Sequence, residues 1–195
     1  MKRKLFPLAL LLLSGCASYQ ATSLNRVVSD AIIETEGLFV SAKAFDKADC
    51  KRYLDRDVLA KGYQPIQLFI ENNTNAHYVF SLDSINLPHV SAEEVARTVH
   101  TSTMGRVLGY GIPGVLILWP LIIPAVVDGI KSSEANDALD RDFYTKTAAD
   151  RVIAPKSTFN RLLFVTSGEY QPTFTVTLIE QESKKAKTFT VSASR

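Results

Sequence analysis

The sequence has few of the residues that build disulfide bonds, metal sites and most catalytic centres. It contains two cysteines, three histidines and one tryptophan in 195 residues. Two cysteines permit at most one disulfide bond, so the fold must depend on a hydrophobic core, to which 46% of the residues can contribute. Basic and acidic residues nearly balance, 22 against 20, and show no strong cluster, so we expect no nucleic-acid partner.

The histidines and carboxylates show no spacing that is typical of a metal or catalytic motif. His77 falls in an expected strand, His89 in a loop and His100 in an expected helical region. The tetrapeptide Leu-Asp-Arg-Asp occurs at 54–57 and again at 139–142, without the spaced oxygens and central glycine of an EF-hand loop. We interpret both copies as solvated charge, and we expect no enzyme activity, no metal and no cofactor.

The first sixteen residues follow the order of a secretory signal. Residues 2–4 are Lys-Arg-Lys, a cationic n-region, and residues 5–13 form an apolar h-region that is too short to span a bilayer. The next residues, Leu13-Ser14-Gly15-Cys16, resemble the lipobox of bacterial lipoproteins, in which the signal peptide is removed before the cysteine. The alternative is an ordinary cleaved signal whose cysteine is incidental. This resemblance covers the signal segment only and identifies no family for the rest of the chain.

The lipobox resemblance implies that residues 1–15 are removed and that Cys16 carries lipid. In that family the sulfur bears a diacylglycerol and the amino group usually bears an acyl chain such as palmitate, which anchors the protein because each buried methylene contributes about 0.8 kcal/mol. In enterobacterial-type envelopes, an aspartate directly after the cysteine retains such proteins in the inner membrane. Here that position is Ala17, and Ser18 follows it. We therefore expect the outer membrane, on its periplasmic face rather than the cell surface.

Cleavage would change the formal net charge from +2 to −1, because the three cationic residues of the n-region are lost. We expect residues 16–24 to form a short lipidated tether, which reaches about 26 Å at most beyond the lipidated cysteine. Residues 25–195 would then form a single domain. With Cys16 lipidated, Cys50 has no partner within the chain. It is most simply a small buried hydrophobic residue, with an intermolecular disulfide or a reactive thiol as alternatives.

Short segments of alternating polarity, separated by polar turns, predict an antiparallel β-sandwich. The polar turn at 72–75 is expected to join two strands as a hairpin, and a helix is expected from an N-cap at Asp46 to about Ala60, with Gly62 following it. The pattern favours an immunoglobulin-like sandwich, although the Cys–Trp–Cys signature is missing. The expected strands are residues 37–45, 63–71, 77–82, 160–166, 173–180 and 187–192.

A helical insertion at 91–149 separates the two groups of strands and makes the expected fold class α+β. Ser91 and Glu94 form a capping-box pattern at its start, and a second helix is expected from about Pro124 to Ala148. Within that helix, Asp142 and Lys146 are spaced to form an i,i+4 ion pair on an exposed face.

The insertion contains 21 residues without a charge, 107–127, which would measure about 31 Å as a helix and so match a bilayer core. Three prolines in this segment, Pro113, Pro120 and Pro124, each cost about 3 kcal/mol inside a helix and argue against a straight span. The alternatives are a spanning helix, a hairpin that dips into lipid, and a hairpin buried in this protein or its oligomer, which we favour. The expected membrane or oligomer contacts are Val115, Leu116, Leu118, Trp119, Leu121 and Ile122.

These observations predict a lipid-anchored, non-enzymatic structural or protein-interaction module of the cell envelope. Its expected partners are the membrane, through the anchor, and either another envelope protein or a second copy of the chain. The alternative is a protein that binds lipid or another apolar ligand through the hydrophobic insertion. A hydrolase whose residues come together only in the folded structure is a third possibility.

Overall fold

The computed structural model describes residues 18–26, 33–101 and 122–193, with the side chains of 122–131 left out. The chain divides into two compact units. One comprises Met1–Tyr19 and His100–Leu139, and the other comprises Gln20–Val99 and Asp140–Arg195. The second unit contains all the strands described below and is called the sandwich unit.

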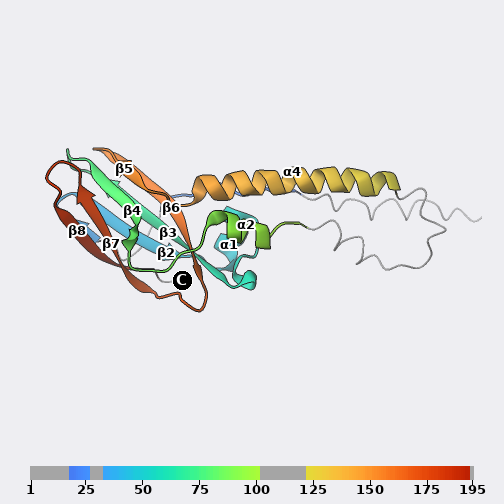
Figure 1. Cartoon of the computed structure of the whole chain (residues 1–195), viewed down its shortest axis with the longest axis horizontal. Coiled ribbons are helices and arrows are strands. Elements are labelled where there is room, and N and C mark those ends of the chain that lie inside the picture. Colours follow the sequence, from blue (N-terminus) through green and yellow to red (C-terminus); the bar gives the residue numbers. More distant parts are fainter. Residues whose placement is uncertain (1–17, 27–32, 102–121, 194–195) are drawn as a thin grey trace, which may run out of the picture. The chain divides into compact units, whose positions relative to one another are not determined.

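The sandwich unit contains two four-stranded sheets, and every pairing of neighbouring strands within them is antiparallel (Figure 1). The α+β sandwich predicted from the sequence is therefore confirmed. The first sheet has the order β1-β2-β3-β6, with β1 at Ile33–Thr35, β2 at Leu38–Ala44, β3 at Tyr63–Asn72 and β6 at Ser157–Thr166. The second has the order β5-β4-β7-β8, with β5 at Arg151–Ile153, β4 at Tyr78–Ile85, β7 at Thr173–Glu180 and β8 at Ala186–Ser192.

Alternating apolar residues place one face of each sheet in a shared core. Ile66, Leu68 and Ile70 of β3 are fully buried in the same cluster as Val176 and Leu178 of β7. Because side chains alternate between faces along a strand, this pattern selects the face that each sheet turns inward. The alternating apolar residues of β3 and β7 thus face the same core.

The predicted hairpin between the strands that became β3 and β4 is wrong. β3 pairs with β2 on one side and β6 on the other, so it has no free edge for β4. The turn itself is present, since Asn72 accepts hydrogen bonds from the backbone N–H of Thr74 (3.0 Å) and from its hydroxyl (2.7 Å). The chain uses this turn to cross to the second sheet.

The helix that was expected to run from Asp46 to about Ala60 is shorter. α1 spans Lys47–Leu54 and begins with a complete capping box, in which Asp46 accepts from the N–H of Asp49 at 2.7 Å. It ends because Asp55 adopts a left-handed conformation with φ 49°. A separate short helix, η2, occupies Leu59–Lys61 and ends at Gly62, whose φ of 85° suits a residue without a Cβ.

Two further helices belong to the insertion. α2 spans Ala92–Thr98, and the N–H of Glu94 donates to Ser91 Oγ at 3.1 Å, while the Glu94 carboxylate accepts from the Tyr63 hydroxyl. α4 spans Ile122–Lys146, close to the predicted bounds. Within the ranges that the structure describes, no helix combines the length and the apolarity needed to cross a membrane.

The last turn of α4 is not the exposed face that the sequence suggested. Lys146 does pair with Asp142 at 2.6 Å, but its residue surface is only 7% exposed and its Nζ donates to the carbonyl of Tyr53 at 2.7 Å. Beside it, Phe143 stacks on Phe164 of β6 with ring centroids 5.5 Å apart. These contacts fix the end of α4 against α1 and the first sheet.

The buried cysteine is confirmed as a packing residue. Cys50 lies on α1, is fully buried and forms no disulfide. Burial, together with the nearby charges of Asp57 and Asp49, raises the pKa of its thiol to about 12. The thiol is therefore uncharged in the folded protein at neutral pH.

Candidate functional site

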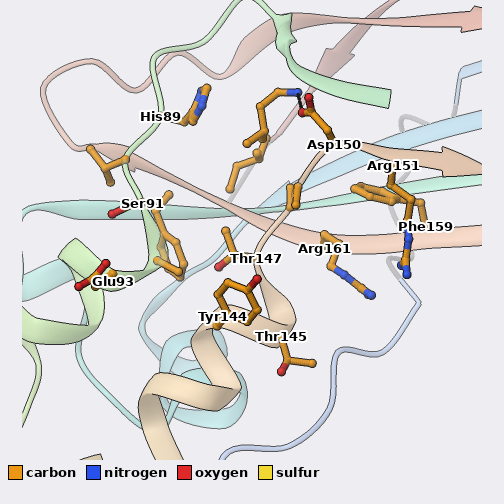
Figure 2. A pocket seen from close by; sticks show the side chains of 17 residues that line it. His89, Ser91, Glu93, Tyr144, Thr145, Thr147, Asp150, Arg151, Phe159 and Arg161 are labelled. Atoms are coloured by element: carbon orange, nitrogen blue, oxygen red, sulfur yellow. Dashed lines mark hydrogen bonds between the residues drawn. The ribbon is translucent and has the colours of Figure 1, made fainter. Parts of the chain in front are cut away.

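A groove of about 840 Å³ lies beside β6, the edge strand of the first sheet (Figure 2). Two segments border this edge: the N–H of Val90 donates to the carbonyl of Phe164 (2.8 Å), and the N–H of Ala148 donates to the carbonyl of Leu162 (2.7 Å). The segment before α2 and the segment after α4 thus form the walls of the groove. All residues that line it belong to the sandwich unit.

Arg161 is one of the charged residues that line this groove. It occupies a position of β6 that faces the core side of the sheet, opposite Leu68 and in phase with Phe159 and Leu163. Its side chain is half-buried, and Nη1 donates to the carbonyl of Asn160 at 2.8 Å. Burial, and then the nearby cation of Arg151, lowers the pKa of Arg161.

The groove holds two arginines whose charges are not neutralised by its carboxylates. Asp150 accepts from the Ser81 hydroxyl (3.1 Å) and from the N–H of Leu82 (2.8 Å), while Glu93 pairs with Arg97. In the described ranges, no ion pair joins Arg151 or Arg161 to a carboxylate. Figure 2 shows both arginines on the same side of the groove as Phe159.

Three of the remaining polar groups of the groove have structural roles. The hydroxyls of Thr145 and Thr147 each donate to a carbonyl one turn earlier in α4 at 2.7 Å, and Ser91 caps α2. His89 is exposed, and none of the hydrogen bonds between described residues joins it to a hydroxyl. The groove can therefore bind an anionic group beside an apolar surface, but it presents no activated nucleophile.

A second feature, which we call the anchor strap, consists of residues 20–26 on the outside of the sandwich unit. At its start the N–H of Gln20 donates to the carboxylate of Asp55 (3.0 Å). Thr22 then donates to the carbonyl of Arg52 through both its N–H (2.9 Å) and its hydroxyl (3.1 Å). The strap therefore begins against the end of α1.

The strap continues along the outer face of the first sheet. Gln67 Nε2 donates to the carbonyl of Asn25 at 2.7 Å, and the side-chain amide of Asn160 donates to the carbonyls of Leu24 and Asn25 at 3.2 and 3.1 Å. Arg26 then forms an ion pair with Glu71. The segment expected to be the lipidated tether, residues 16–24, is thus bonded to the sandwich from Gln20 onward.

Most site residues predicted from the sequence lie outside the described residues. These are Cys16, Val115, Leu116, Leu118, Trp119 and Leu121. Ile122 is the first residue of α4, and its side chain is not described. The interpretation of residues 54–57 as solvated charge needs revision, because the Asp55 carboxylate accepts a hydrogen bond from the strap. Burial would raise the pKa of Asp55, but the hydrogen bonds from Lys51 and Gln20 outweigh burial and lower this pKa.

Sequence reasoning missed the arginines of the groove and the amides that hold the strap. One signal was available in the sequence. Arg161 is a charged residue at a strand position that alternation assigns to the apolar face, together with Phe159 and Leu163. For Gln67 and Asn160 no such signal exists, because polar residues on an outward face are ordinary.

In the described ranges no cluster of three or more histidine, cysteine, aspartate or glutamate side chains could hold a metal ion. Comparison with protein-family models and with curated proteins found no match to this chain.

Proposed function

We propose that this protein is a lipid-anchored, non-enzymatic interaction module of the bacterial envelope that binds an acidic segment of a partner protein in its groove. The observation that carries this proposal is the presence of Arg151 and Arg161, without carboxylate partners, beside an apolar lining. An arginine fork donates two parallel hydrogen bonds to a carboxylate, and such bonds are stronger in a partly desolvated groove than in water.

The energetics of Arg161 favour a ligand over a purely structural role. A half-buried guanidinium loses hydration, and a second cation nearby makes its charged form less stable. A hydrophobic side chain would fit the core-facing position of Arg161 without either penalty. An acidic ligand would supply the missing counter-charge, and apolar side chains beside its carboxylates would pack on Phe159 and Leu163.

We also propose that the sandwich is immunoglobulin-like. Its strand order supports this, because β2-β3-β6 and β4-β7-β8 follow the A-B-E and C-F-G arrangement of that fold, and β5 takes the place of C′. The insertion then occupies the connection between C and C′. Binding through loops and strand edges is common on such sandwiches, so the groove is in a plausible place for recognition.

The anchor is tested with Cys16→Ser in the full chain. We expect the variant to remain as an uncleaved or mislocalised precursor, because lipid-dependent processing requires the thiol. Fractionation of the envelope and the intact mass of the purified protein measure this. Normal mature protein in the outer-membrane fraction would rule out the lipid anchor.

The groove is tested with a fluorescent peptide of alternating glutamate and leucine and with its glutamine-for-glutamate counterpart. We expect the acidic peptide to bind, and we expect Arg161→Gln and Arg151→Gln each to weaken binding by about tenfold, since a charge-assisted hydrogen bond contributes about 1.5 to 3 kcal/mol. Lys185→Gln, a change of equal charge in the exposed turn between β7 and β8, is the control and should bind normally.

Two outcomes would contradict the groove proposal. One is equal binding of the acidic and neutral peptides, or binding that the arginine variants do not weaken. The other is arginine-dependent binding of phosphatidylglycerol vesicles in place of the peptide, which would favour the alternative function of lipid binding. Fluorescence anisotropy and vesicle flotation distinguish these results.

A further inference from the structure

We infer that the end of the sandwich unit that carries α1 faces the membrane, and that the anchor strap holds it there. This inference rests on the proposed lipid anchor at Cys16. The surface concerned is the one around Asp55 and η2, which we call the anchor end, and its partner is a lipid bilayer surface.

Strand registers define two ends of the sandwich unit. At the anchor end, the N–H of Phe45 donates to the carbonyl of Pro65 near the start of β3 (2.9 Å), and the N–H of Ser167 donates to the carbonyl of Gly62 (2.8 Å). Figure 1 shows α1 and α2 at this end of the strands.

The opposite end, which we call the distal end, is made by the turns after β1, β3 and β7. The N–H of Asn73 donates to the carbonyl of Gly37 (2.8 Å), and the N–H of Gln181 donates to the carbonyl of His77 (2.8 Å). β3 contains ten residues, so the two ends are about 30 Å apart.

The strap brings the start of the chain back to the anchor end. Without it, the seventeen residue steps from Cys16 to Ile33 could extend about 56 Å and permit any orientation of the domain. With Gln20 bonded to Asp55, only four residue steps separate Cys16 from the domain, about 15 Å at most. That reach is half the length of the sandwich, so the anchor end stays close to the lipid while the distal end can lie farthest from it.

The points at which the insertion joins the sandwich unit lie at the same end. Glu94 of α2 bonds to Tyr63, the first residue of β3, at 3.1 Å. Lys146, the last residue of α4, bonds to the carbonyl of Tyr53 on α1 at 2.7 Å. Gln20, at the start of the strap, and both junctions of the apolar insertion are therefore on the side of the domain that we assign to the membrane.

The experiment uses the full-length, acylated protein in vesicles of phosphatidylethanolamine and phosphatidylglycerol that contain a lipid with a nitroxide on its headgroup. A maleimide fluorophore is attached at Lys61→Cys on η2 or at Asn75→Cys in the turn after β3, both exposed positions. The buried Cys50 should not react. We expect the label at residue 61 to be quenched at least twofold more strongly than the label at residue 75.

A strap-release variant, Asp55→Ala with Gln67→Ala and Asn160→Ala, removes the carboxylate that holds Gln20 and the amides that hold Leu24 and Asn25. We expect it to reduce the difference in quenching between the two labels. Asp83→Ala with Gln171→Ala and Gln181→Ala, which alters one exposed carboxylate and two exposed amides elsewhere, is the matched control and should keep the difference. The comparison of the two labels in the otherwise unchanged protein is decisive by itself, even if the strap-release variant does not fold.

Intact mass distinguishes the two ways in which the inference can fail. An acylated protein whose two labels are quenched equally, or whose distal label is quenched more, would overturn the orientation and leave the anchor intact. A membrane-bound protein without an acyl group would overturn the anchor itself, and the orientation with it.

Discussion

At the scale of single residues, the buried amides of Gln64 and Asn72 differ from Arg161 in having hydrogen-bond partners that meet their needs. Gln64 is fully buried, and its amide donates to the carbonyls of Phe45 and Pro65, both at 2.9 Å. Asn72, also fully buried, donates to the carbonyl of Ala76 at 2.8 Å. Such groups are stable because their lost hydration is replaced. The Arg161 side chain donates a hydrogen bond to a backbone carbonyl but has no ion-pair partner among the described residues. We therefore propose that it recognises the acidic ligand.

Cys50 should be unreactive in the folded protein. With its pKa raised to about 12, the thiolate that attacks a maleimide or iodoacetamide is nearly absent at pH 7.5. We expect no alkylation after an hour under native conditions and complete alkylation in 6 M guanidinium chloride, measured by intact mass on a chain that begins after Cys16. Ser183→Cys in an exposed turn is the positive control. Rapid native labelling of Cys50 would contradict its structural role.

The same pKa shift predicts a dependence of stability on pH. The unfolded thiol ionises above about pH 8.5, whereas the folded thiol stays protonated up to about pH 12, so its contribution is fully present at lower pH and is lost as the pH rises. The free energy of unfolding should therefore fall more steeply between pH 9 and 11 in the wild type than in Cys50→Ala. Urea denaturation at each pH measures both slopes, and parallel slopes would refute the shift.

At the scale of secondary-structure elements, local signals predicted most segments but not their ends or partners. β7 has the predicted bounds of Thr173–Glu180, because regular alternation and flanking turns define a strand locally. The predicted single helix became α1 and η2, since the left-handed Asp55 interrupts it. The pairing of β4 was wrong because a turn fixes a change of direction and not the sheet that receives the next strand.

The capping box of α1 should contribute measurably to stability. Asp46→Ala removes the acceptor for the N–H of Asp49, and we expect a loss of about 1 kcal/mol in the free energy of unfolding. Asp83→Ala, at an exposed position of β4, is the control for loss of one negative charge and should change it by less than about 0.5 kcal/mol. Urea denaturation measures the free energy of unfolding of both variants, and equal losses would contradict the predicted role of the cap.

At the scale of the whole molecule, the three alternatives for the apolar segment 107–127 differ in how much of the chain would contact lipid. Most of its expected contact residues lie outside the described residues, so the three alternatives are tested by experiment. We propose the buried hairpin. In a chain that begins after Cys16 and so carries no lipid, Leu118→Lys should then lower the free energy of unfolding by several kcal/mol, because a buried ammonium loses its hydration without gaining a partner.

Thermal denaturation and liposome flotation separate the alternatives for this segment. Ser133→Lys, at an exposed position of α4, is the control and should leave the melting temperature unchanged. An unchanged melting temperature for Leu118→Lys with weakened liposome binding would favour the hairpin that dips into lipid. A wild-type chain that is insoluble without detergent would favour the spanning helix.

The sequence by itself determined the elements with a strong local pattern: the alternating strands of an antiparallel sandwich, the caps at Asp46 and Ser91, and the lipobox resemblance from which the anchor is proposed. Tertiary structure decided which sheet receives β4, that Lys146 is buried, that Arg161 opens onto a groove, and that the strap is bonded to Gln67 and Asn160. The physical reason is one of range. Periodicity and capping act over a few residues, whereas these features join segments as much as 136 positions apart, which no local pattern encodes.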